Sequence, residues 1–439
     1  DSKYIGQMMT YINSSEFFLI TAAQESIHEG FCIYSSQGLN FLKETSLNPE
    51  QKENVGYKIP FPNDKLIRVP VEEKYHENLC RISVDNHADL RFMNQLHSEL
   101  GSNKFNISSV VDHLKSNPGL LNIHSHVQQK LVDHKLLKIV FVISIDPQVG
   151  LGHASRITGL AQELNESFHH QIQFLIPNNN YSKSYFRELG YENECLFYNV
   201  PDLYDTLKNL NYDLFVIDDK NLDLEKLKLI LANQHVWLYD QVPENDHYPE
   251  HWTYFLQGIQ VIPEKHFKNV EWGFKTVFLN KSLEYHFNQN IDSPNTIINL
   301  GGSEKNLQLI EHFRDDLVDR PNLKIASRVP LKENFGENIK QNNLFKEIAN
   351  CIKGITFYGV SFYEFLLLGK EVCVICRDQN EEMIINEILA NYEIVKTEKL
   401  AQNYFFKLKT DYNSIKKSQR KMLNKRLGDI LKSKKGHHA

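Results

Sequence analysis

The feature that most constrains this chain is the stretch at residues 138–156, KIVFVISIDPQVGLGHASR. Its first part, 139–145, is a β-branched apolar run with the length and composition of a buried strand. The run breaks at Pro147, turns through Gly150 and Gly152, and enters an amphipathic segment, HASRITGLAQEL. The order strand, glycine turn, helix predicts an α/β unit in which backbone amides at a helix N-terminus face a polar or anionic ligand.

The alternation of strand-like and helix-like segments continues along the chain. It runs through residues 138–284 and restarts near Asn295, where TIINLGGSEKN gives a second strand, glycine turn and helix. Such repetition is typical of parallel sheets that bind ligands at the carboxyl ends of their strands. We therefore predict two Rossmann-like α/β domains, at 135–284 and 285–439, after a mixed α/β block at 1–134. The basic helix predicted from Asn413 onward is expected to be a solvated face or to pack against the middle domain.

Composition narrows the choice of partners and compartment. A chain of 439 residues, 41% hydrophobic and 24% charged, is too long for one ordinary core and typical of a soluble globular protein. Its net charge of -6 gives no reason to expect nucleic acid, and no apolar run is long enough to span a bilayer. The six cysteines show no paired framework, and we interpret Cys373 and Cys376 in the strand-like CVIC as small core residues. A cytoplasmic, reducing location is the default expectation.

His153 stands where the helix after the first glycine turn is predicted to begin. The turn at Gly150 and Gly152 lacks the third glycine of a dinucleotide fingerprint, and no acid ends the next strand-like run, HQIQFLIP, which argues against NAD. A histidine in this place can act as a base or orient a water molecule, although it can also simply cap the helix. Arg156, one turn later, is expected either to contact a phosphate or to pair with an acid at a strand end.

The second glycine turn is a candidate phosphate site. It contains Gly301, Gly302 and Ser303, directly after an apolar strand-like run. Two glycines and a hydroxyl at a helix start can present backbone amides to a diphosphate. The alternative interpretation is an ordinary tight turn between a strand and a helix.

A third turn, at Gly359 and Ser361, precedes an otherwise apolar helix, FYEFLLLG, that contains Glu364. A carboxylate that faces inward from such a helix needs a partner. The two hydroxyls of a ribose suit it, because each can donate to one carboxylate oxygen. The alternative is that Glu364 lies on an exposed side of the helix.

Polar residues also follow other predicted strands. Asp378 and Gln379 come soon after the CVIC run, at a strand carboxyl end where they could touch a bound sugar. Asp218, Asp219 and Asp240 end further strands, and we expect at least one of these three to cap a helix.

The order of these motifs resembles the two-domain GT-B fold. G-x-G-H-x-x-R follows the first strand, GGS follows the first strand of the next domain, and a glycine–serine turn with a glutamate and a Gln-containing turn come later. Over about residues 138–400 the chain looks most like the UDP-sugar hydrolases of pseudaminic acid biosynthesis. Those enzymes cleave UDP-2,4-diacetamido-2,4,6-trideoxy-β-L-altropyranose to the free sugar and UDP. The segments GLGHASR and LGGSEKN match the family pattern closely.

The resemblance implies a mechanism and a set of contacts. His153 would position or deprotonate the attacking water, the 301–303 turn would hold the diphosphate, and Glu364 would hold the ribose. Cleavage of the C–O bond would need no metal, with backbone amides stabilising UDP as leaving group. The family carries Asn-Gln in the last turn, and its Asn assists at the sugar. Here Asp378 stands in the place of that Asn and is the second candidate catalytic residue, Gln379 and Asn380 follow it, and the identity of the sugar is open.

The first block resembles the C-terminal half of the GT-A-like nucleotide-sugar cytidylyltransferases. RISVDNHADL is similar to their R-x-x-V-D-x-x-x-D-L segment, in which the first Asp, here Asp85, binds Mg²⁺ beside the nucleotide. The family's glycine-rich CTP loop is not found in this sequence. Mg²⁺ usually needs further carboxylates and substrate phosphates. We therefore expect this block to be inactive, as the remainder of a truncated transferase or as a degenerate domain.

Three functions follow from these interpretations. The first is hydrolysis of a UDP-sugar for nonulosonic acid biosynthesis without a cofactor, with Mg²⁺ considered only for the first block. The second is a glycosyltransferase of the same fold, for which HWTYF at 251–255 is a candidate docking patch. The third is a non-catalytic nucleotide-sugar-binding protein that pairs with a complete cytidylyltransferase. A homo-oligomer is the other assembly that we consider.

Overall fold

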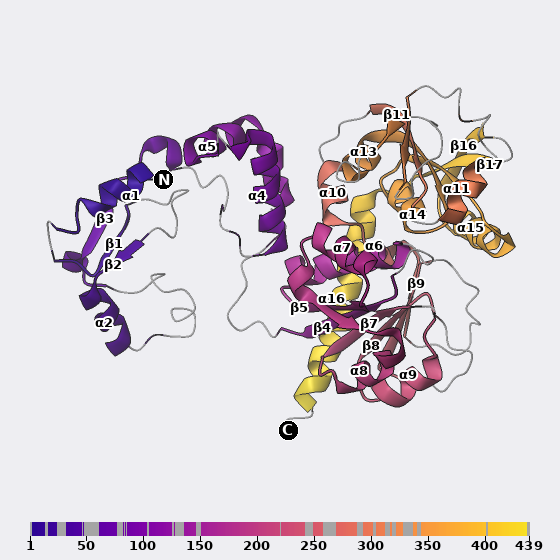
Figure 1. Ribbon diagram of the computed structural model, residues 1–439, viewed down its shortest axis with the longest axis horizontal. Coiled ribbons are helices and arrows are strands. Elements are labelled where there is room, and N and C mark those ends of the chain that lie inside the picture. The colour runs from indigo at the N-terminus through magenta and orange to yellow at the C-terminus, as the bar shows by residue number, and fades with distance from the viewer. Residues whose placement is uncertain are drawn as a thin grey trace. The chain divides into compact units, whose positions relative to one another are not determined.

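The computed structural model divides the chain into two compact units, Asp1–His134 (unit 1) and Lys135–Ala439 (unit 2) (Figure 1). We describe each unit by itself. The residues that the structure describes are 2–13, 16–23, 32–45, 47, 61–76, 82, 84, 86–102, 105–124, 127, 136–145, 151–219, 221–241, 249–257, 269–287, 293–301, 304–311, 317, 322–327, 337–339, 344–400 and 403–436.

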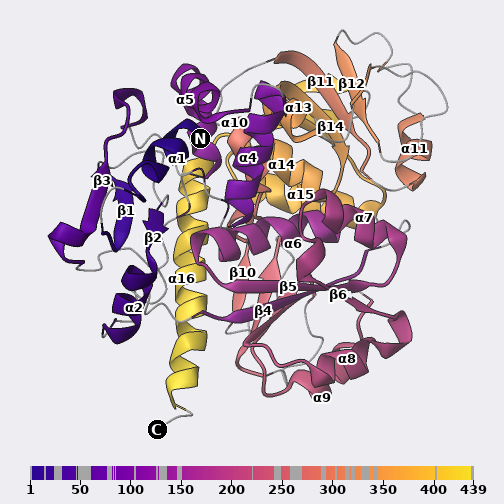
Figure 2. The same ribbon diagram turned by 60° about the vertical axis from the view of Figure 1, so that its left-hand side comes forward.

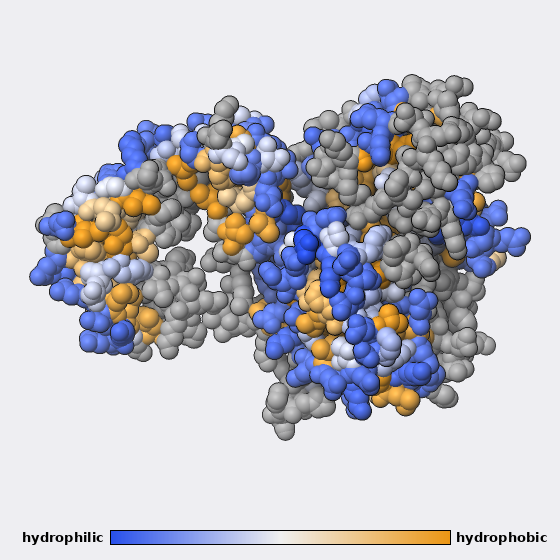
Figure 3. Space-filling model, viewed as in Figure 1, coloured by the Kyte–Doolittle hydropathy of each residue, from blue (hydrophilic) through white to orange (hydrophobic). Residues whose placement is uncertain are grey.

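Unit 1 contains a small three-stranded sheet. Its middle strand β1 (Leu19–Ala22) pairs antiparallel with β2 (Cys32–Tyr34) and parallel with β3 (Leu66–Val69). The described α-helices are α1 (Ser2–Met9), α2 (Ser36–Glu44), α4 (His87–Leu100) and α5 (Ile107–Ser116). Figure 3 shows hydrophobic residues on the surface of this unit, as expected where a small sheet covers little apolar area. The nucleotidyltransferase-like fold that we predicted for residues 1–134 is not established by these strands and stays a prediction.

The start of α4 follows from its sequence. Asn86 lies before the first helical residue in an extended conformation, and its side-chain oxygen accepts hydrogen bonds from the amides of Ala88 and Asp89 at 2.9 and 3.0 Å. This is the N-cap geometry expected of an Asn that precedes an amphipathic run. The predicted helix start near Asn86 is confirmed.

The first half of unit 2 is a parallel α/β domain with seven strands. The strands are β4 (Lys138–Ile143), β5 (Gln171–Pro177), β6 (Cys195–Tyr198), β7 (Leu214–Asp218), β8 (Val236–Tyr239), β9 (Trp252–Leu256) and β10 (Val270–Trp272). Their order in the sheet is β10-β9-β8-β7-β4-β5-β6, and every described pairing is parallel. This is the order of a Rossmann sheet, with the reversal of strand order between β4 and β7.

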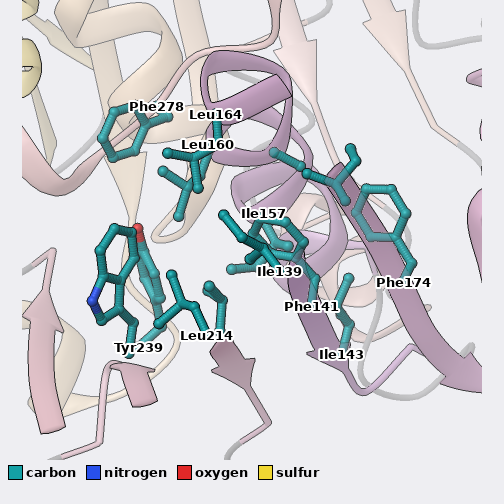
Figure 4. Packing of buried hydrophobic residues seen from close by; sticks show 14 of the residues in the cluster. Ile139, Phe141, Ile143, Ile157, Leu160, Leu164, Phe174, Leu214, Tyr239 and Phe278 are labelled. Carbon is teal, nitrogen blue, oxygen red and sulfur yellow. The ribbon is translucent and has the colours of Figure 1, made fainter. Parts of the chain in front are cut away.

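The helices of this domain cover an apolar sheet. They are α6 (Gly152–Gln162), which continues as a π-helical turn η5 (Glu163–Ser167), α7 (Asn180–Glu188), α8 (Leu203–Asn209) and α9 (Leu224–Leu231). Figure 4 shows Leu160 of α6 and Ile139 of β4 in one packed cluster. A Cβ at Gly159 would lie 2.2 Å from the carbonyl oxygen of Phe278, so only glycine lets the linker between the two domains pass this close to α6.

The second half of unit 2 repeats the architecture. Its strands are β11 (Ser293–Asn299), β12 (Leu323–Ala326), β13 (Glu337–Asn338), β14 (Cys351–Phe357), β15 (Glu371–Ile375), β16 (Ile394–Leu400) and β17 (Asn403–Leu408). Their order is β13-β12-β11-β14-β15-β17-β16; the first five are parallel, and the β16–β17 hairpin is antiparallel. The described α-helices before the C-terminal one are α10 (Lys281–Phe287), α11 (Glu304–Glu311), α13 (Leu344–Asn350), α14 (Val360–Leu367) and α15 (Gln379–Asn391). The prediction of two Rossmann-like α/β domains in series is confirmed.

The C-terminal helix α16 (Tyr412–Gly436) belongs to both domains (Figure 2). Tyr412 and Ile415, near its start, lie in the core of the second domain. Leu423 and Leu427, two to three turns later, lie in the core of the first. The helix therefore returns across the domain boundary and packs against the middle domain, which is one of the two placements expected for it.

Truncating a core side chain of α16 is expected to destabilise unit 2. Leu423 is fully buried, so Leu423→Ala should lower the free energy of unfolding by about 2–5 kcal/mol through lost burial and a residual cavity. Chemical denaturation followed by circular dichroism measures this. Lys425→Ala, on the exposed side of the same helix, is the matched control and should change stability by less than about 0.5 kcal/mol. Equal effects of the two substitutions would contradict the packing described.

Two sequence interpretations are decided by the sheets. Cys373 is fully buried in β15, and Cys376 is partly buried just after this strand, consistent with the reading of CVIC as core. The stretch at 251–255 is largely the buried strand β9 rather than a docking patch, and Trp252 has no exposed surface. In the part of the chain that the structure describes, no helix is long and apolar enough to cross a membrane.

Candidate active site

The candidate active site lies where the strand order of the first sheet reverses. His153 is the second residue of α6, after β4, and Asp218 is the last residue of β7. Because β4 and β7 are parallel neighbours, their carboxyl ends bring the two side chains together. His153 Nδ1 lies 2.5 Å from Asp218 Oδ1. The N-cap of α6 is Leu151, which makes no side-chain cap hydrogen bond, so His153 does not cap the helix.

The Asp218 carboxylate fixes the imidazole of His153. Burial alone would raise the pKa of Asp218, but Arg156 and His153 outweigh it and lower this pKa to about 2. Asp218 is therefore ionised at neutral pH and accepts a hydrogen bond from Nδ1–H of His153. In that tautomer the lone pair of a neutral imidazole is on Nε2, as in enzymes that use a histidine as general base.

Arg156 has a role other than the phosphate contact considered for it. Its guanidinium is 6% exposed and donates to Asp218 from Nε at 2.7 Å and from Nη2 at 2.5 Å. Nη1 donates to Asp240 and, at 3.0 Å, to Gln257 Oε1. Of the two roles expected for Arg156, pairing with acids at strand ends is the one that the structure shows. Arg156 as a substrate-binding residue is therefore not supported by its contacts.

The strand-end acids differ from one another. Asp218 and Asp240 both pair with Arg156. Asp219 accepts a hydrogen bond from the amide of Asn221 within a turn, and α9 is capped by Asp223 instead. The expectation that at least one of these three acids caps a helix was wrong, because α9 begins several residues after the end of β7.

The reversal point of the second sheet brings two turns together. Asn299 ends β11, accepts a hydrogen bond from the amide of Gly301 at 3.1 Å and donates to Ser361 Oγ at 2.9 Å. Gly301 has φ +63° and Gly359 has φ +152°, and a Cβ at either would meet no atom within 4 Å. These backbone conformations favour glycine, and the space beside both turns is open. The carboxamide of Asn299 thus links the two turns predicted to hold a nucleotide.

Glu364 lies inside the second domain at its seam with the first. It is 4% exposed, and Ser155 Oγ of α6 lies 3.5 Å from its Oε1. Burial raises the pKa of Glu364 to about 7, although hydrogen bonds from Ser361 and Ser155 oppose this shift. The side chain faces inward, as considered for it, and it is placed close to the helix that carries His153.

The buried carboxyl of Glu364 should make stability depend on pH. Its pKa in the folded state exceeds its ordinary value, so its contribution is fully present below about pH 4.5 and is lost as the pH rises through about 7. Between about pH 5 and pH 9 we expect the free energy of unfolding to fall by about 2–3 kcal/mol more in the wild type than in Glu364→Gln. Urea denaturation at several pH values measures this difference. Parallel pH profiles for the two proteins would contradict it.

Asp378 and Gln379 lie at the start of α15. Asp378 is its N-cap and accepts a hydrogen bond from the amide of Glu381 at 2.9 Å, and both Asp378 and Gln379 are exposed. Arg377 pairs with Glu381 and donates to the carbonyl of Tyr358 at 2.9 Å. The capping bond accounts for an acid at position 378, so the catalytic role expected for Asp378 stays a prediction, as does sugar binding by Gln379.

Several predicted site residues lie outside the described residues: Gly150, Gly302, Ser303 and Asp85. Gly152 is described; a Cβ there would meet no atom within 4 Å, so the approach to the first turn of α6 is open. Among the residues that the structure describes, no group of three His, Cys, Asp or Glu side chains could hold a metal ion. The Mg²⁺ site predicted at Asp85 stays a prediction.

Sequence reasoning missed four side chains at this site: Ser155, Asn299, Gln257 and Tyr358. Ser155 and Asn299 carried a usable signal, since each flanks a glycine turn. Tyr358, whose hydroxyl lies 3.1 Å from that of Tyr363, stands just before Gly359. Gln257 follows a strand that the sequence alone did not identify.

Comparisons with known proteins give only distant similarities. No family model matches the chain, and no curated protein matches it. Among solved structures, UDP-GlcNAc 2-epimerase from Methanocaldococcus jannaschii, in complex with UDP-GlcNAc and UDP, is 10% identical, with 65% of this chain and 98% of that chain covered and a TM-score of 0.39. MurG from Acinetobacter baumannii is 11% identical, with coverages of 58% and 84% and a TM-score of 0.38. The calicheamicin glycosyltransferase CalG4 is 14% identical, with coverages of 70% and 100% and a TM-score of 0.38. The strand order described above, rather than these similarities, defines the fold.

Proposed function

We propose that unit 2 is a nucleotide-sugar hydrolase of the GT-B type that releases UDP and a free diacetamido-trideoxyhexose for pseudaminic-type acid biosynthesis. The observation that carries the proposal is the His153–Asp218 pair at the reversal point of the first sheet. It supplies an oriented base, and the motif resemblance supplies the substrate class. The choice of sugar rests on that resemblance alone.

In the proposed reaction the base activates water. His153 Nε2 takes a proton from the water, whose oxygen forms a bond to the anomeric carbon of the sugar. The bond from this carbon to the diphosphate oxygen breaks, and its electron pair leaves with UDP. Asp218 stabilises the imidazolium that forms, as in other His–Asp pairs. The proton passes from His153 to solvent or to the departing UDP.

The second domain is proposed to hold the nucleotide. The open turns at Gly301 and Gly359 precede the helices α11 and α14, whose free N-terminal N–H groups can stabilise an anion such as the diphosphate. Glu364 is proposed to accept hydrogen bonds from the ribose hydroxyls. In the part of the chain that the structure describes, its buried carboxyl interacts with the hydroxyls of Ser361 and Ser155 and with no cation, so two hydroxyl donors would suit its ionised form.

The two alternatives receive less support. An exposed docking patch at 251–255 would have favoured a membrane-associated glycosyltransferase. Most of this stretch is instead the buried strand β9. A protein that only binds nucleotide sugars would not need an oriented histidine and aspartate. Neither alternative gains an observation of its own from the described residues.

The proposal is tested by release of UDP from purified protein. We expect UDP and free sugar to form from a UDP-diacetamido-trideoxyhexose in buffer with chelator and without lipid acceptor. UDP-GlcNAc serves as the comparison substrate and should turn over more slowly. Turnover only on addition of a lipid acceptor would select the glycosyltransferase, and tight UDP binding without turnover would select the binding protein.

A further inference from the structure

The charges behind His153 form a closed cluster with Arg156 at its centre. Nε and Nη2 of Arg156 donate hydrogen bonds to Asp218, and Nη1 donates to Asp240 and Gln257. Nη2 also lies 3.3 Å from His153 Nδ1, and the guanidinium carbon lies 5.5 Å from the centre of the Tyr239 ring. With its polar edges occupied and 6% of its surface exposed, Arg156 acts inside the protein.

Asp240 is held in an unusual conformation to serve this cluster. It follows β8 with φ +48°, a left-handed value that costs energy for a residue other than glycine. Three hydrogen bonds fix it there. Its amide donates to the carbonyl of Phe255 at 2.9 Å, its Oδ1 accepts from the amide of Gln257 at 3.1 Å, and its Oδ2 accepts from Arg156. Such strain persists where the surrounding structure over-determines it, as it does at functional sites.

The cluster carries one excess negative charge. The carboxylates of Asp218 and Asp240 face the single guanidinium of Arg156. The phenols of Tyr239, Tyr358 and Tyr363 also interact with the cluster, and burial raises their pKa values so that they stay neutral. A proton accepted by His153 during the reaction would therefore balance the charge of the whole cluster.

We propose that Asp240 and Gln257 are positioning residues, which hold Arg156 in place so that Arg156 fixes Asp218 against His153, and that the carboxylate of Asp240 supplies the charge that stabilises the imidazolium. Neither residue needs to touch the substrate. The kinetic part of this proposal rests on the proposed hydrolytic function. Its structural part concerns only the hydrogen bond of His153 and does not depend on that function.

The kinetic test moves the negative charge between two positions. Asp240→Asn keeps the shape of the side chain and removes its charge, so kcat for UDP release should fall about 10- to 100-fold while KM changes by less than about threefold. Gln257 Oε1 reaches the same Nη1, so the double variant Asp240→Asn/Gln257→Glu returns a carboxylate to Arg156. The kcat of this double variant should be at least about fivefold higher than that of Asp240→Asn. Gln257→Leu, which removes one acceptor without changing the charge, should lower kcat only about fivefold.

The structural test does not depend on activity. The Nδ1–H proton of His153 should give a low-field NMR resonance in the wild type that is lost in Asp218→Asn, shifted in Asp240→Asn and restored in the double variant. An enzyme without turnover but with this pattern would overturn the proposed hydrolysis and keep the positioning role. Any of three results would overturn the inference. The first is a folded Asp240→Asn with unchanged kcat, the second is a loss of kcat/KM in this variant that comes entirely from a higher KM, and the third is a double variant whose kcat does not recover. Should Asp240→Asn fail to fold, an unshifted resonance and unchanged kcat in Gln257→Leu would overturn it as well.

Discussion

Replacing His153 by alanine is expected to lower the rate of UDP release about a thousandfold, because a positioned general base contributes about 10²- to 10⁴-fold. The reason lies in the geometry of the pair: Nδ1 is held 2.5 Å from Asp218 Oδ1, which leaves Nε2 for the water. Removing the ring leaves the turns of the second domain in place. The change should therefore appear in kcat, with the affinity for UDP altered by less than about threefold. Steady-state kinetics and calorimetric titration with UDP measure the two quantities.

The companion substitution separates base chemistry from packing. Asp218→Asn removes the charge that orients His153 and should lower kcat to a similar extent, because an asparagine amide can hold the imidazole in the wrong tautomer. Ser184→Ala, at an exposed position on α7, is the control and should retain full activity. Full activity in His153→Ala, or loss of UDP binding without loss of kcat, would contradict the assignment of His153 as the base.

Replacing Lys281 by methionine is expected to lower the free energy of unfolding by about 3–5 kcal/mol, the usual cost of leaving buried charges without their partner. Lys281, at the start of α10, is 5% exposed and pairs with Glu163, and its Nζ lies 3.4 Å from Glu284 Oε2. Burial alone would lower the pKa of Lys281, but these carboxylates outweigh it and raise it. The cation therefore joins η5 of the first domain to α10, the helix that opens the second.

The helix α16 completes this network. Lys416 donates to Glu284 at 2.7 Å, and Tyr412 donates to the same carboxylate at 2.5 Å. Burial opposes ionisation of Glu284, but Lys281 and Lys416 outweigh it and lower its pKa to about 2. Its contribution to stability is thus present above about pH 4.5 and is lost as the pH falls through about 2.

Chemical denaturation near neutral pH tests the Lys281 prediction. The matched control is Arg187→Met, which breaks the exposed pair of Arg187 and Glu192 and should cost less than about 1 kcal/mol. A small loss in Lys281→Met, equal to that of the control, would show that Lys416 and the other cations suffice to hold both glutamates. It would contradict the central role given to Lys281.

Local sequence determined the strands and helices beside the glycine motifs of unit 2, but it did not identify strands such as β9. The β-branched run at 139–145 gave the buried strand β4, and the helices α6, α11 and α14 follow the strands β4, β11 and β14, as the glycine motifs predicted. These features follow from side-chain periodicity and from backbone freedom at glycine, which act over a few residues. The same local signals singled out His153 and Glu364, since a polar residue beside a glycine turn, or inside an apolar helix, stands out in the sequence.

Contacts between distant segments could not be obtained in this way. Asp218 is 65 residues from His153, Asp240 is 84 residues from Arg156, and Glu364 is 209 residues from Ser155. Each contact depends on which strands are neighbours in a sheet, or on how the two domains of unit 2 meet. For the same reason the sequence could not choose between a phosphate contact and an ion pair for Arg156. It also did not show that Asp378 caps α15.

The stretch at 138–156 shows the division most clearly. Its own residues determined a strand, a glycine turn and a helix that begins next to a histidine, because these preferences are set by neighbours along the chain. Only the tertiary structure decided that this histidine would face an ionised aspartate. That pairing requires β7 to lie beside β4, and strand order is fixed by the packing of the whole sheet rather than by any one segment.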